Sequence, residues 1–490
     1  YQQEFSQSVI FIMFESNISE AGEYATQYFA WWIVLAFIAH TAFAVFLWTR
    51  LRPVYLPRGQ SMLAAAAIAL AVVGYPLVKQ IATSDNMEQA IDRFETRIEP
   101  AVPWQMIVAY RRYTEQLDNM QGMLTSASQI PPLKNLKDSM AGQPSTLVLV
   151  IGESTNRQRM SLYGYPRNTT PELDKLRDQL AVFDNVITPR PYTIEALQQV
   201  LTFADEENPD LYLKTPSIVS VMKQAGYKTY WITNQQTMTK RNTMLTTFSE
   251  QADEQVYLNN NRNQNARQYD GDVLAPFSKA LADPAERKFI VVHLLGTHMS
   301  YQYRYPPTFD KFTDRQGVPE GVSDAQLPTY NSYDNAVLYN DFVVSSLIKD
   351  YAKTDPNGFL LYLSDHGEDV FDSAGHTTLG RNEGKPTAPM YTIPFMAYAS
   401  PKWRESHDWS FAGDLQRPYS SSQLIHTWAD LAGLSFDEWD RSKSLVSDSF
   451  TPRPLMIGNP YERQQKGLID FSLIKPKKRT TDVVLQEPLQ

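Results

Sequence analysis

The sequence predicts an α/β protein, in which a mostly parallel sheet is sandwiched by helices and preceded by transmembrane helices. Two observations lead to this prediction. Two uncharged apolar segments lie near the N-terminus, and after residue 144 short apolar runs rich in β-formers alternate with helical patterns. Strands buried on both faces and separated by helices are typical of a parallel sheet with helices on both sides. The 490 residues suffice for more than one domain.

Residues 29–49 and 62–78 are the candidate membrane spans. The first has no formal charge, is long enough to cross a hydrocarbon core, and has tryptophans near its ends, where interfacial aromatic residues belong. The second is shorter and rich in alanine, so a buried helix of a soluble protein is its alternative. Residues 8–20 are interpreted as a partial N-terminal element, either the end of another span or a surface helix.

The loop at 50–60, between the two spans, carries three arginines and no acid. Because short basic loops stay in the cytoplasm, we expect the rest of the chain on the exported side. Residues 81–143 would be an amphipathic helical connector, 144–475 an exported catalytic α/β domain, and 476–490 a polar tail. In a Gram-negative cell this is a multi-pass inner-membrane protein with its catalytic domain in the periplasm. The first residue is Tyr rather than Met, so we expect a processed or incomplete product.

Composition excludes several classes of protein. The net charge is -9, so no basic excess is present to pair with the phosphates of nucleic acid. The absence of cysteine removes disulfides, thiolate zinc sites, iron–sulfur clusters and cysteine nucleophiles together.

Five runs are expected to form the sheet, because each is short, apolar and rich in β-formers. Helical patterns separate them, for example at 193–204 and 217–226. The expected strands are "TLVLVIG" (146–152), "YKTYWIT" (227–233), "KFIVVHLLG" (288–296), "GFLLYLSDHG" (358–367) and "YTIPFMAYAS" (391–400).

Candidate metal ligands follow two of these strands. Glu153 comes directly after the first, and Asp365 and His366 lie at the end of "LYLSDHGEDV". Ligands of open α/β sheets bind beyond the carboxyl ends of the strands. Carboxylate oxygen and imidazole nitrogen are ligands that Zn²⁺ accepts. The alternative is a strand that leads into an ordinary polar loop.

Thr193 stands where a helix begins in "PRPYTIEALQQ". It could serve only as a helix N-cap, which is a common role for threonine. A helix start also presents free N–H groups, which can bind phosphate oxygens. A threonine hydroxyl bound to a metal there would lose its proton more easily and become a nucleophile.

Three histidines lie close to the strand ends in sequence. His298 follows Gly296, where a loop could direct it into the site, and His376 could return to the same cleft as His366. His293 lies within a strand and is interpreted as a buried structural residue.

Six stretches, taken in order, resemble the phosphoethanolamine transferases of the alkaline phosphatase/sulfatase superfamily. Within them the chain is most similar to the branch that modifies a heptose of the lipopolysaccharide core. The resemblance covers residues 100–475 approximately. It rests on "LVLVIGESTNRQRMSLYGYPRNTTPELDKL", "RPYTIEALQQVLTFADEENPDLYL", "YKTYWITNQQTMTKRNTML", "HLLGTHMSYQYRYP", "FLLYLSDHGEDVFD" and "LIHTWADLAGLS".

The resemblance implies one firm zinc site, and leaves open a second, weaker one. The zinc would be held by Glu153, Thr193, Asp365 and His366, with Thr193 as the nucleophile. Six further residues match family positions that contact the substrate. They are His298, His376, Lys240, Asn234, Ser16 and Glu20.

The implied reaction moves phosphoethanolamine from phosphatidylethanolamine to a lipopolysaccharide core sugar or another envelope glycan, through a phosphoethanolamine-threonine intermediate. Nucleic acid is not an expected partner. A phosphoglycerol transferase or a phosphodiesterase on the same fold is the first alternative. A non-catalytic, membrane-anchored glycolipid-binding protein is the alternative from another class. The acceptor is expected to be chosen by loops such as 299–335.

Overall fold

The computed structural model describes two parts of the chain, which are treated separately below. The described residues up to 118 belong to one unit, and those from 132 onward to the other. The described residues are 31–51, 55–84, 87, 90, 91, 93, 94, 104, 106–108, 110, 111, 114, 118, 132–235, 244–259, 269–407, 409, 411, 413–461 and 467–474.

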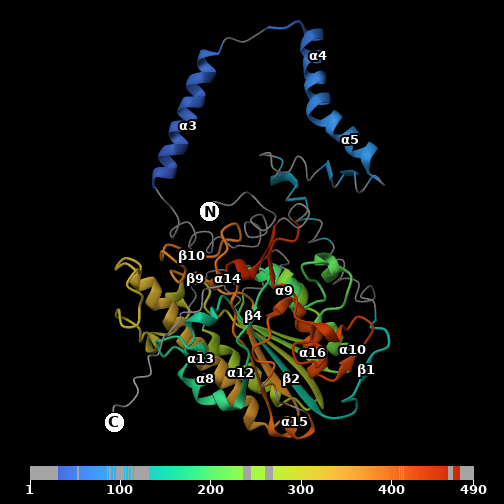
Figure 1. Ribbon diagram of the computed structural model, residues 1–490, viewed down its shortest axis with the longest axis vertical. Helices are drawn as coiled ribbons and strands as arrows, with labels where there is room; N and C mark the ends of the chain where they lie inside the picture. The colour runs from blue at the N-terminus through green and yellow to red at the C-terminus, as the bar shows by residue number, and fades with distance from the viewer. Residues whose placement is uncertain are drawn as a thin grey trace, which may run out of the picture. The chain divides into compact units, whose positions relative to one another are not determined.

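The first unit carries two apolar helical stretches (Figure 1). Helix α3 spans Trp31–Arg50, and a second stretch of 26 residues spans Arg58–Thr83. Both are long and apolar enough to cross a membrane. In the most apolar 18 residues of each stretch, no residue is buried. The second is longer than the span expected from sequence, so it reaches the length that a bilayer requires.

The second stretch consists of α4 (Arg58–Ala69), a π-helical turn (Leu70–Gly74) and α5 (Tyr75–Thr83). Pro76 lies at the start of α5. Proline has no N–H to donate to the preceding turn, and such interruptions favour a local π-type turn within a continuous helix.

The second unit is built on a seven-stranded sheet (Figure 1). From one edge to the other its order is β3-β11-β8-β2-β7-β5-β6. The five strands from β8 to β6 are parallel, and β11 is antiparallel to both of its neighbours. In that order the strands are Leu180–Val182, Phe395–Ala399, Phe359–Ser364, Ser145–Gly152, Arg287–His293, Lys228–Thr233 and Glu254–Tyr257.

Helices cover both faces of this sheet, which buries the central strands completely. All residues of β2 are buried. On one face Val148 belongs to a core cluster with Phe277 of α12 and Val343 of α13. On the other face Trp428 of α16 packs edge-to-face against Phe289 of β7, with ring centroids 5.1 Å apart. Helices α12, α13 and α16 span Leu274–Leu281, Leu327–Lys353 and Leu424–Leu431.

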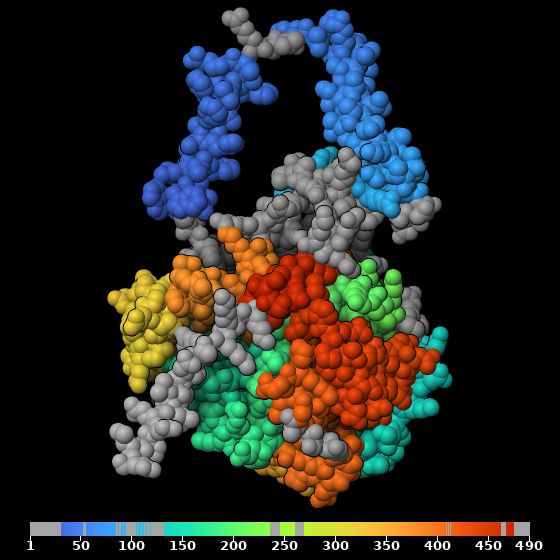
Figure 2. Space-filling model, in the orientation of Figure 1, coloured from blue at the N-terminus to red at the C-terminus, as the bar shows by residue number. Residues whose placement is uncertain are grey.

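The remaining elements are short. The later segments of the chain, coloured orange to red, form much of the visible face of this unit (Figure 2). The further helices are α8 (Pro171–Leu176), α9 (Thr193–Val200), α10 (Ile218–Gln224), α11 (Met244–Ser249), α14 (Ala388–Tyr391) and α15 (Pro401–Ser406). The further strands are β1 (Lys137–Asp138), β4 (Val186–Ile187), β9 (Asp369–Val370), β10 (Leu379–Gly380), β12 (Tyr419–Ser420), β13 (Leu434–Ser435), β14 (Met456–Gly458) and β15 (Leu468–Asp470).

The expected α/β fold is confirmed, with three differences in detail. The fifth expected strand pairs antiparallel, and two short edge strands, β3 and β6, were not expected. Helix α13 begins at Leu327, inside the stretch 299–335 that was expected to be a loop. The inward side of α13 includes buried polar residues such as Asp334 and Asn340, each of which has a polar partner. The sequence of α13 therefore lacks the apolar stripe by which a surface helix is usually recognised.

Candidate metal centre

The carboxyl ends of β2 and β8 bring three metal-ligand side chains together. The two strands are parallel neighbours, and Gly152 pairs with Ser364, so the residues that follow them emerge side by side. Glu153, Asp365 and His366 each offer one ligand atom, and these atoms lie within 4.8 Å of one another. All three residues are fully buried. The arrangement matches the edge of the sheet at which the sequence predicted a site.

Thr193 joins this cluster from the start of α9. Its Oγ1 donates a hydrogen bond to Glu153 Oε2 at 3.0 Å and lies 3.3 Å from His366 Nε2. The N-cap residue of the helix is Tyr192, which makes no side-chain capping bond, so the simple N-cap interpretation of Thr193 is wrong. The Thr193 hydroxyl therefore faces the ligand cluster instead of capping its own helix.

The imidazole of His366 is oriented by the backbone beside it. Nδ1 lies 2.9 Å from the carbonyl oxygen of Gly367, which can only accept a hydrogen bond. The proton is therefore on Nδ1, and the lone pair of Nε2 faces the cluster, as a metal ligand requires. Glycine at 367 allows this close packing, because a Cβ there would lie 2.1 Å from the carbonyl oxygen of Pro389.

The electrostatics of the cluster favour a bound cation. Burial by itself would raise the pKa of Glu153, but the neighbouring His366 and Arg381 side chains hold it well below its usual range. Burial and the charge of Glu153 together raise the pKa of Asp365 well above its usual range. Asp365 Oδ2 is buried with no hydrogen-bond partner among the described residues. A divalent cation would satisfy that oxygen and neutralise both carboxylates, so the donor set fits a zinc ion.

Three side chains that contact or border the cluster were not predicted from the sequence. Arg381 Nη1 lies 2.6 Å from His366 Nε2, and Gln235 Nε2 donates to Glu153 Oε2 at 3.3 Å. Glu368 is fully buried, and neither of its carboxylate oxygens has a hydrogen-bond partner among the described residues. Glu368 was visible in the quoted "SDHGED" motif, whereas Arg381 and Gln235 follow no pattern in the sequence.

The turn after Glu153 is held from two sides. Ser154 has a positive φ of 59° and its Oγ donates to Glu153 Oε1 at 2.9 Å. The Tyr333 hydroxyl, from α13, donates to the Ser154 carbonyl. Gly296 approaches from the other side, where a Cβ would lie 2.5 Å from the carbonyl oxygen of Glu153. This packing fixes the direction of the Glu153 carboxylate.

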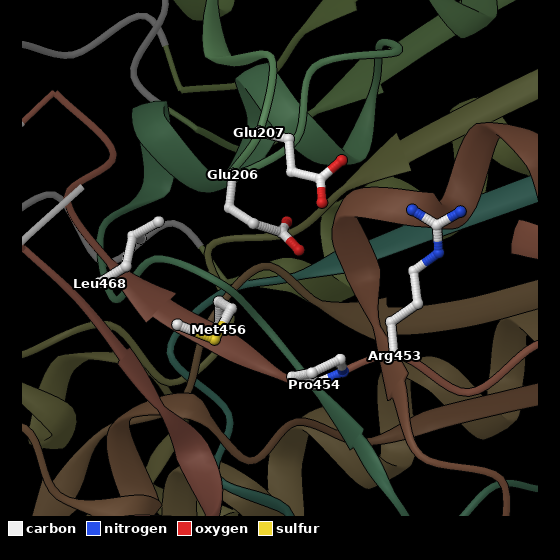
Figure 3. Close-up of a pocket in the computed structure, with 6 residues that line it drawn as sticks. All are labelled: Glu206, Glu207, Arg453, Pro454, Met456 and Leu468. Atoms are coloured by element: carbon white, nitrogen blue, oxygen red, sulfur yellow. The ribbon is translucent and has the colours of Figure 1, made fainter. Parts of the chain in front are cut away.

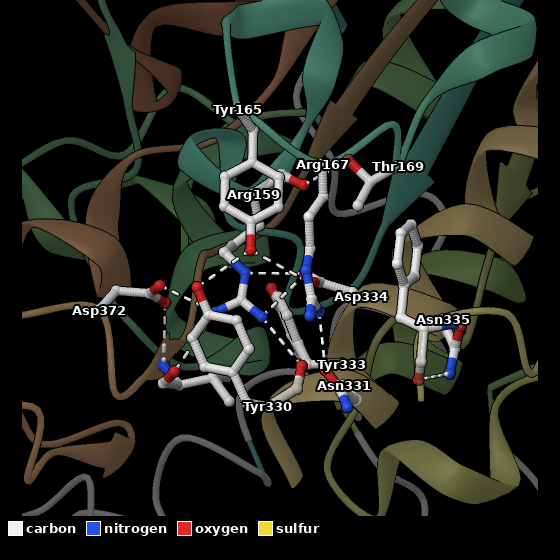
Figure 4. Close-up of polar contacts among 12 residues, drawn as sticks. Arg159, Tyr165, Arg167, Thr169, Tyr330, Asn331, Tyr333, Asp334, Asn335 and Asp372 are labelled. Carbon is white, nitrogen blue, oxygen red and sulfur yellow. Dashed lines mark hydrogen bonds and ion pairs between the residues drawn. The ribbon is translucent and has the colours of Figure 1, made fainter. Parts of the chain in front are cut away.

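A buried ionic network lies behind that turn (Figure 4). Asp334 accepts from Arg159 Nε at 2.9 Å and from Arg167 Nη1 at 2.8 Å, and Arg159 also donates to Asp372 at 2.9 Å. The guanidinium of Arg159 lies over the ring of Tyr330, 3.6 Å from its centroid. Because Asp334 and Tyr333 are neighbours on α13, the network anchors the helix that supports Ser154.

Two of the residues that were predicted to contact the substrate, His298 and Asn234, lie in the described part of the chain outside the four-residue cluster. His298 is half-buried, its Nδ1 has no hydrogen-bond partner among the described residues, and desolvation lowers the pKa of its imidazole to about 3. Asn234 is buried and donates to Asp270 Oδ1 at 2.8 Å, and Asp270 in turn accepts from the N–H groups of Leu295 and Gly296. Asn234 therefore helps to hold the 294–296 turn.

His376 lies in a separate turn, with its Nδ1 2.6 Å from the carbonyl oxygen of Phe371. Within the described residues, no hydrogen bond or ion pair joins it to the four cluster residues. Lys240, Ser16 and Glu20 lie outside the described residues. His293 is buried in β7 and packs edge-to-face against Trp231, with ring centroids 6.1 Å apart.

A separate hollow of about 360 Å³ lies beside β14 (Figure 3). The carboxylates of Glu206 and Glu207 lie on one side of it, and Arg453 lies on the other (Figure 3). Its lining contains none of the four cluster residues, so it is distinct from the candidate metal centre.

Comparison with known proteins shows the family to which the chain belongs. Residues 145–434 match the family model described as Sulfatase. The chain is 55% identical over 479 residues to the phosphoethanolamine transferase CptA of Salmonella typhimurium, which covers 97% of this chain and 83% of that protein. It is 58% identical to the C-terminal periplasmic domain of EptC from Escherichia coli, solved in complex with Zn, with a TM-score of 0.69 over 71% of this chain and 98% of that domain.

A likeness of fold extends over most of the chain. The integral membrane protein lipooligosaccharide phosphoethanolamine transferase A (EptA) from Neisseria meningitidis is 18% identical, with a TM-score of 0.63 over 93% of this chain and 84% of that one. These matches confirm the expected sulfatase-like fold and the resemblance identified from the sequence motifs.

Proposed function

Because the chain belongs to the phosphoethanolamine transferases of the sulfatase family, we propose that it moves phosphoethanolamine from phosphatidylethanolamine to a lipopolysaccharide core sugar, a heptose, with Thr193 as the covalent carrier. The observation that supports this proposal most strongly is the position of the Thr193 hydroxyl, 3.0 Å from Glu153 Oε2 among buried zinc-type ligands. The two apolar helices support a membrane-anchored protein, in keeping with a lipid donor.

A zinc ion held by Glu153, Thr193, Asp365 and His366 would lower the pKa of the threonine hydroxyl and neutralise charge on the phosphate. In the structure the Thr193 proton is already directed to Glu153 Oε2. The His366 ring is fixed through Gly367, so its Nε2 faces the same point. Glu153, Asp365 and His366 are fully buried, which limits the access of bulk water to these three groups.

The first step forms a bond between Thr193 Oγ1 and phosphorus and breaks the bond from phosphorus to the glycerol oxygen. Diacylglycerol leaves with a proton. The N–H groups at the start of α9 can donate to phosphate oxygens at the point of attack. In the second step an acceptor hydroxyl attacks phosphorus, the bond to Thr193 Oγ1 breaks, and the hydroxyl is restored. Such a cycle predicts ping-pong kinetics.

The test is to incubate the zinc-loaded protein with phosphatidylethanolamine and no acceptor. We expect diacylglycerol release in a burst near one per active site, and peptide mass spectrometry should find phosphoethanolamine on Thr193. Thr193→Ala should give no burst, and Thr193→Ser should retain part of it, because serine keeps the hydroxyl.

Two results would contradict the proposal. Release by Thr193→Ala at the parent rate would mean that water attacks, as in a phosphodiesterase. A burst with phosphatidylglycerol and none with phosphatidylethanolamine would identify a phosphoglycerol transferase. The acceptor is tested separately, by mass spectrometry of core glycolipids from cells with the parent and with Thr193→Ala.

A further inference from the structure

Arg381 reaches into the candidate metal centre from the segment after β10. Its Nη1 lies 2.6 Å from His366 Nε2 and 3.7 Å from Glu153 Oε1, and its Nε lies 4.0 Å from Glu368 Oε1. The side chain is only 14% exposed. Among the described lysines and arginines, no other lies within 4.0 Å of a carboxylate oxygen of Glu153, Asp365 or Glu368.

Arg381 supplies a positive charge that the buried carboxylates need in addition to the charge of a metal ion. Glu153, Asp365 and Glu368 are three fully buried carboxylates. A zinc ion supplies two positive charges, and the Arg381 guanidinium supplies the third. Buried charges persist only when they are paired, so Arg381 belongs to the site and is not a surface residue that happens to lie nearby.

The geometry also places Arg381 beside the proposed nucleophile. Thr193 Oγ1 donates to Glu153 Oε2 at 3.0 Å, and Arg381 Nη1 lies 3.7 Å from Oε1 of the same carboxylate. A phosphorus atom attacked by Thr193 therefore has its oxygens within reach of the guanidinium. Arginine is well suited to this contact, because its planar group can bind two phosphate oxygens at once.

The segment that carries Arg381 is fixed to the segment that carries Thr193. Glu383 forms an ion pair with Arg190, with Nε and Oε1 2.7 Å apart, and the two side chains are 8% and 3% exposed. The N–H of Glu383 also donates to the Tyr192 hydroxyl at 3.4 Å. Arg190 and Tyr192 lie three residues and one residue before Thr193, so these two contacts hold the segment of Thr193 beside the segment that carries Arg381.

We propose that Arg381 binds the phosphate of the transferred group, and that the Arg190–Glu383 pair positions it beside Thr193. The inference rests on the proposed function for the identity of the substrate. Arg381 is a substrate-binding residue here, and Glu383 is a positioning residue.

The first experiment measures binding with O-phosphoethanolamine as the probe, by calorimetry on the zinc-loaded full chain in detergent, with zinc content determined in parallel. Arg381→Ala should retain zinc and bind the probe at least about tenfold more weakly, and Arg381→Lys should fall between it and the parent. Arg404→Ala, in α15 and outside the site, is the matched control and should bind as the parent does. Binding by Arg381→Ala within twofold of the parent would overturn the proposal.

The second experiment separates positioning from general structural damage. Glu383→Gln should keep zinc and raise KM for phosphatidylethanolamine more than it lowers kcat. The double variant Arg381→Ala/Glu383→Gln should bind the probe no more weakly than Arg381→Ala, because the pair acts through Arg381. Fully additive losses would overturn the positioning role. If the parent binds the probe through Arg381 but transfers nothing from phosphatidylethanolamine, the proposed function fails and the phosphate contact stands.

Discussion

The hydroxyl of Tyr333 donates a hydrogen bond of 2.7 Å to the carbonyl oxygen of Ser154, a residue 179 positions earlier in the chain. The same hydroxyl accepts a hydrogen bond of 2.8 Å from the N–H of Asn156. One side chain of α13 therefore satisfies two buried backbone groups in the turn that follows Glu153. Buried backbone groups without a partner are costly, so this hydroxyl holds the turn in place.

Tyr333→Phe should consequently lower the free energy of unfolding by about 1–3 kcal/mol, because two buried backbone groups lose their partner. We also expect weaker zinc binding, since the direction of Glu153 depends on this turn. Urea denaturation and chelator competition measure the two effects. Tyr303→Phe, which removes a hydroxyl with no hydrogen bond among the described residues, is the control. Equal stability of the Tyr333 variant and the parent would contradict this account of the turn.

Removal of a ligand should empty the metal centre. Asp365→Ala and His366→Ala are each expected to lose zinc and transfer activity together, because a site with four ligands opens when one is removed. His293→Asn should retain zinc, since His293 lies within β7 and packs against Trp231. Elemental analysis of purified protein measures the content. Full zinc occupancy in both ligand variants would place the metal elsewhere.

His426 should make stability depend on pH. Burial lowers the pKa of this imidazole from its ordinary value to about 4, and its Nδ1 accepts a hydrogen bond from the N–H of Asp440. A lowered pKa in the folded state stabilises the protein above the unfolded value of about 6.5, and this stability is lost as pH falls from there toward 4. The full loss is about 3 kcal/mol.

His426→Asn removes that titration and keeps an acceptor for Asp440. The variant should therefore lose less stability than the parent between pH 7 and pH 4.5, measured by urea denaturation at each pH. Parallel pH profiles for the variant and the parent would show that His426 does not titrate as described.

The expected topology can be tested with single cysteines, because the chain has none of its own. Gln60→Cys lies at the start of the second apolar stretch, beside the basic loop, and Ser449→Cys lies on the exposed surface of the sheet unit. A membrane-impermeant maleimide should label Ser449→Cys in intact spheroplasts and Gln60→Cys only after permeabilisation. Labelling of Gln60→Cys without permeabilisation would reverse the assigned orientation.

The main features of the fold could be predicted because they are local in sequence. Central strands such as β2 are continuous apolar runs, and each expected strand overlaps an observed one. The direction of β11 and the pairing of β3 could not be predicted, because direction depends on distant partners. Helix α13 was missed since Asp334 and Asn340 interrupt its apolar pattern, and only tertiary contacts show that they are paired.

The candidate site was only partly predictable. Glu153, Asp365 and His366 directly follow strands, so their meeting follows from sheet order, and Thr193 follows from a recognisable helix start. Their roles as ligands and nucleophile stay predictions. Arg381 could not be found this way, because no sequence pattern marks its segment, which tertiary contacts such as the Arg190–Glu383 pair join to the segment of Thr193.

The order of strands also determines when, during synthesis, the protein can become active. Ser154, beside the first ligand, and Asp365 are 211 residues apart in sequence, and β8, which precedes Asp365, pairs with β2 only after the intervening β5 and β7 have been made. A growing or truncated chain that ends before residue 366 holds Thr193 without a complete metal site. Such a chain lacks Asp365 and His366, so under the proposed mechanism it would form no intermediate on Thr193.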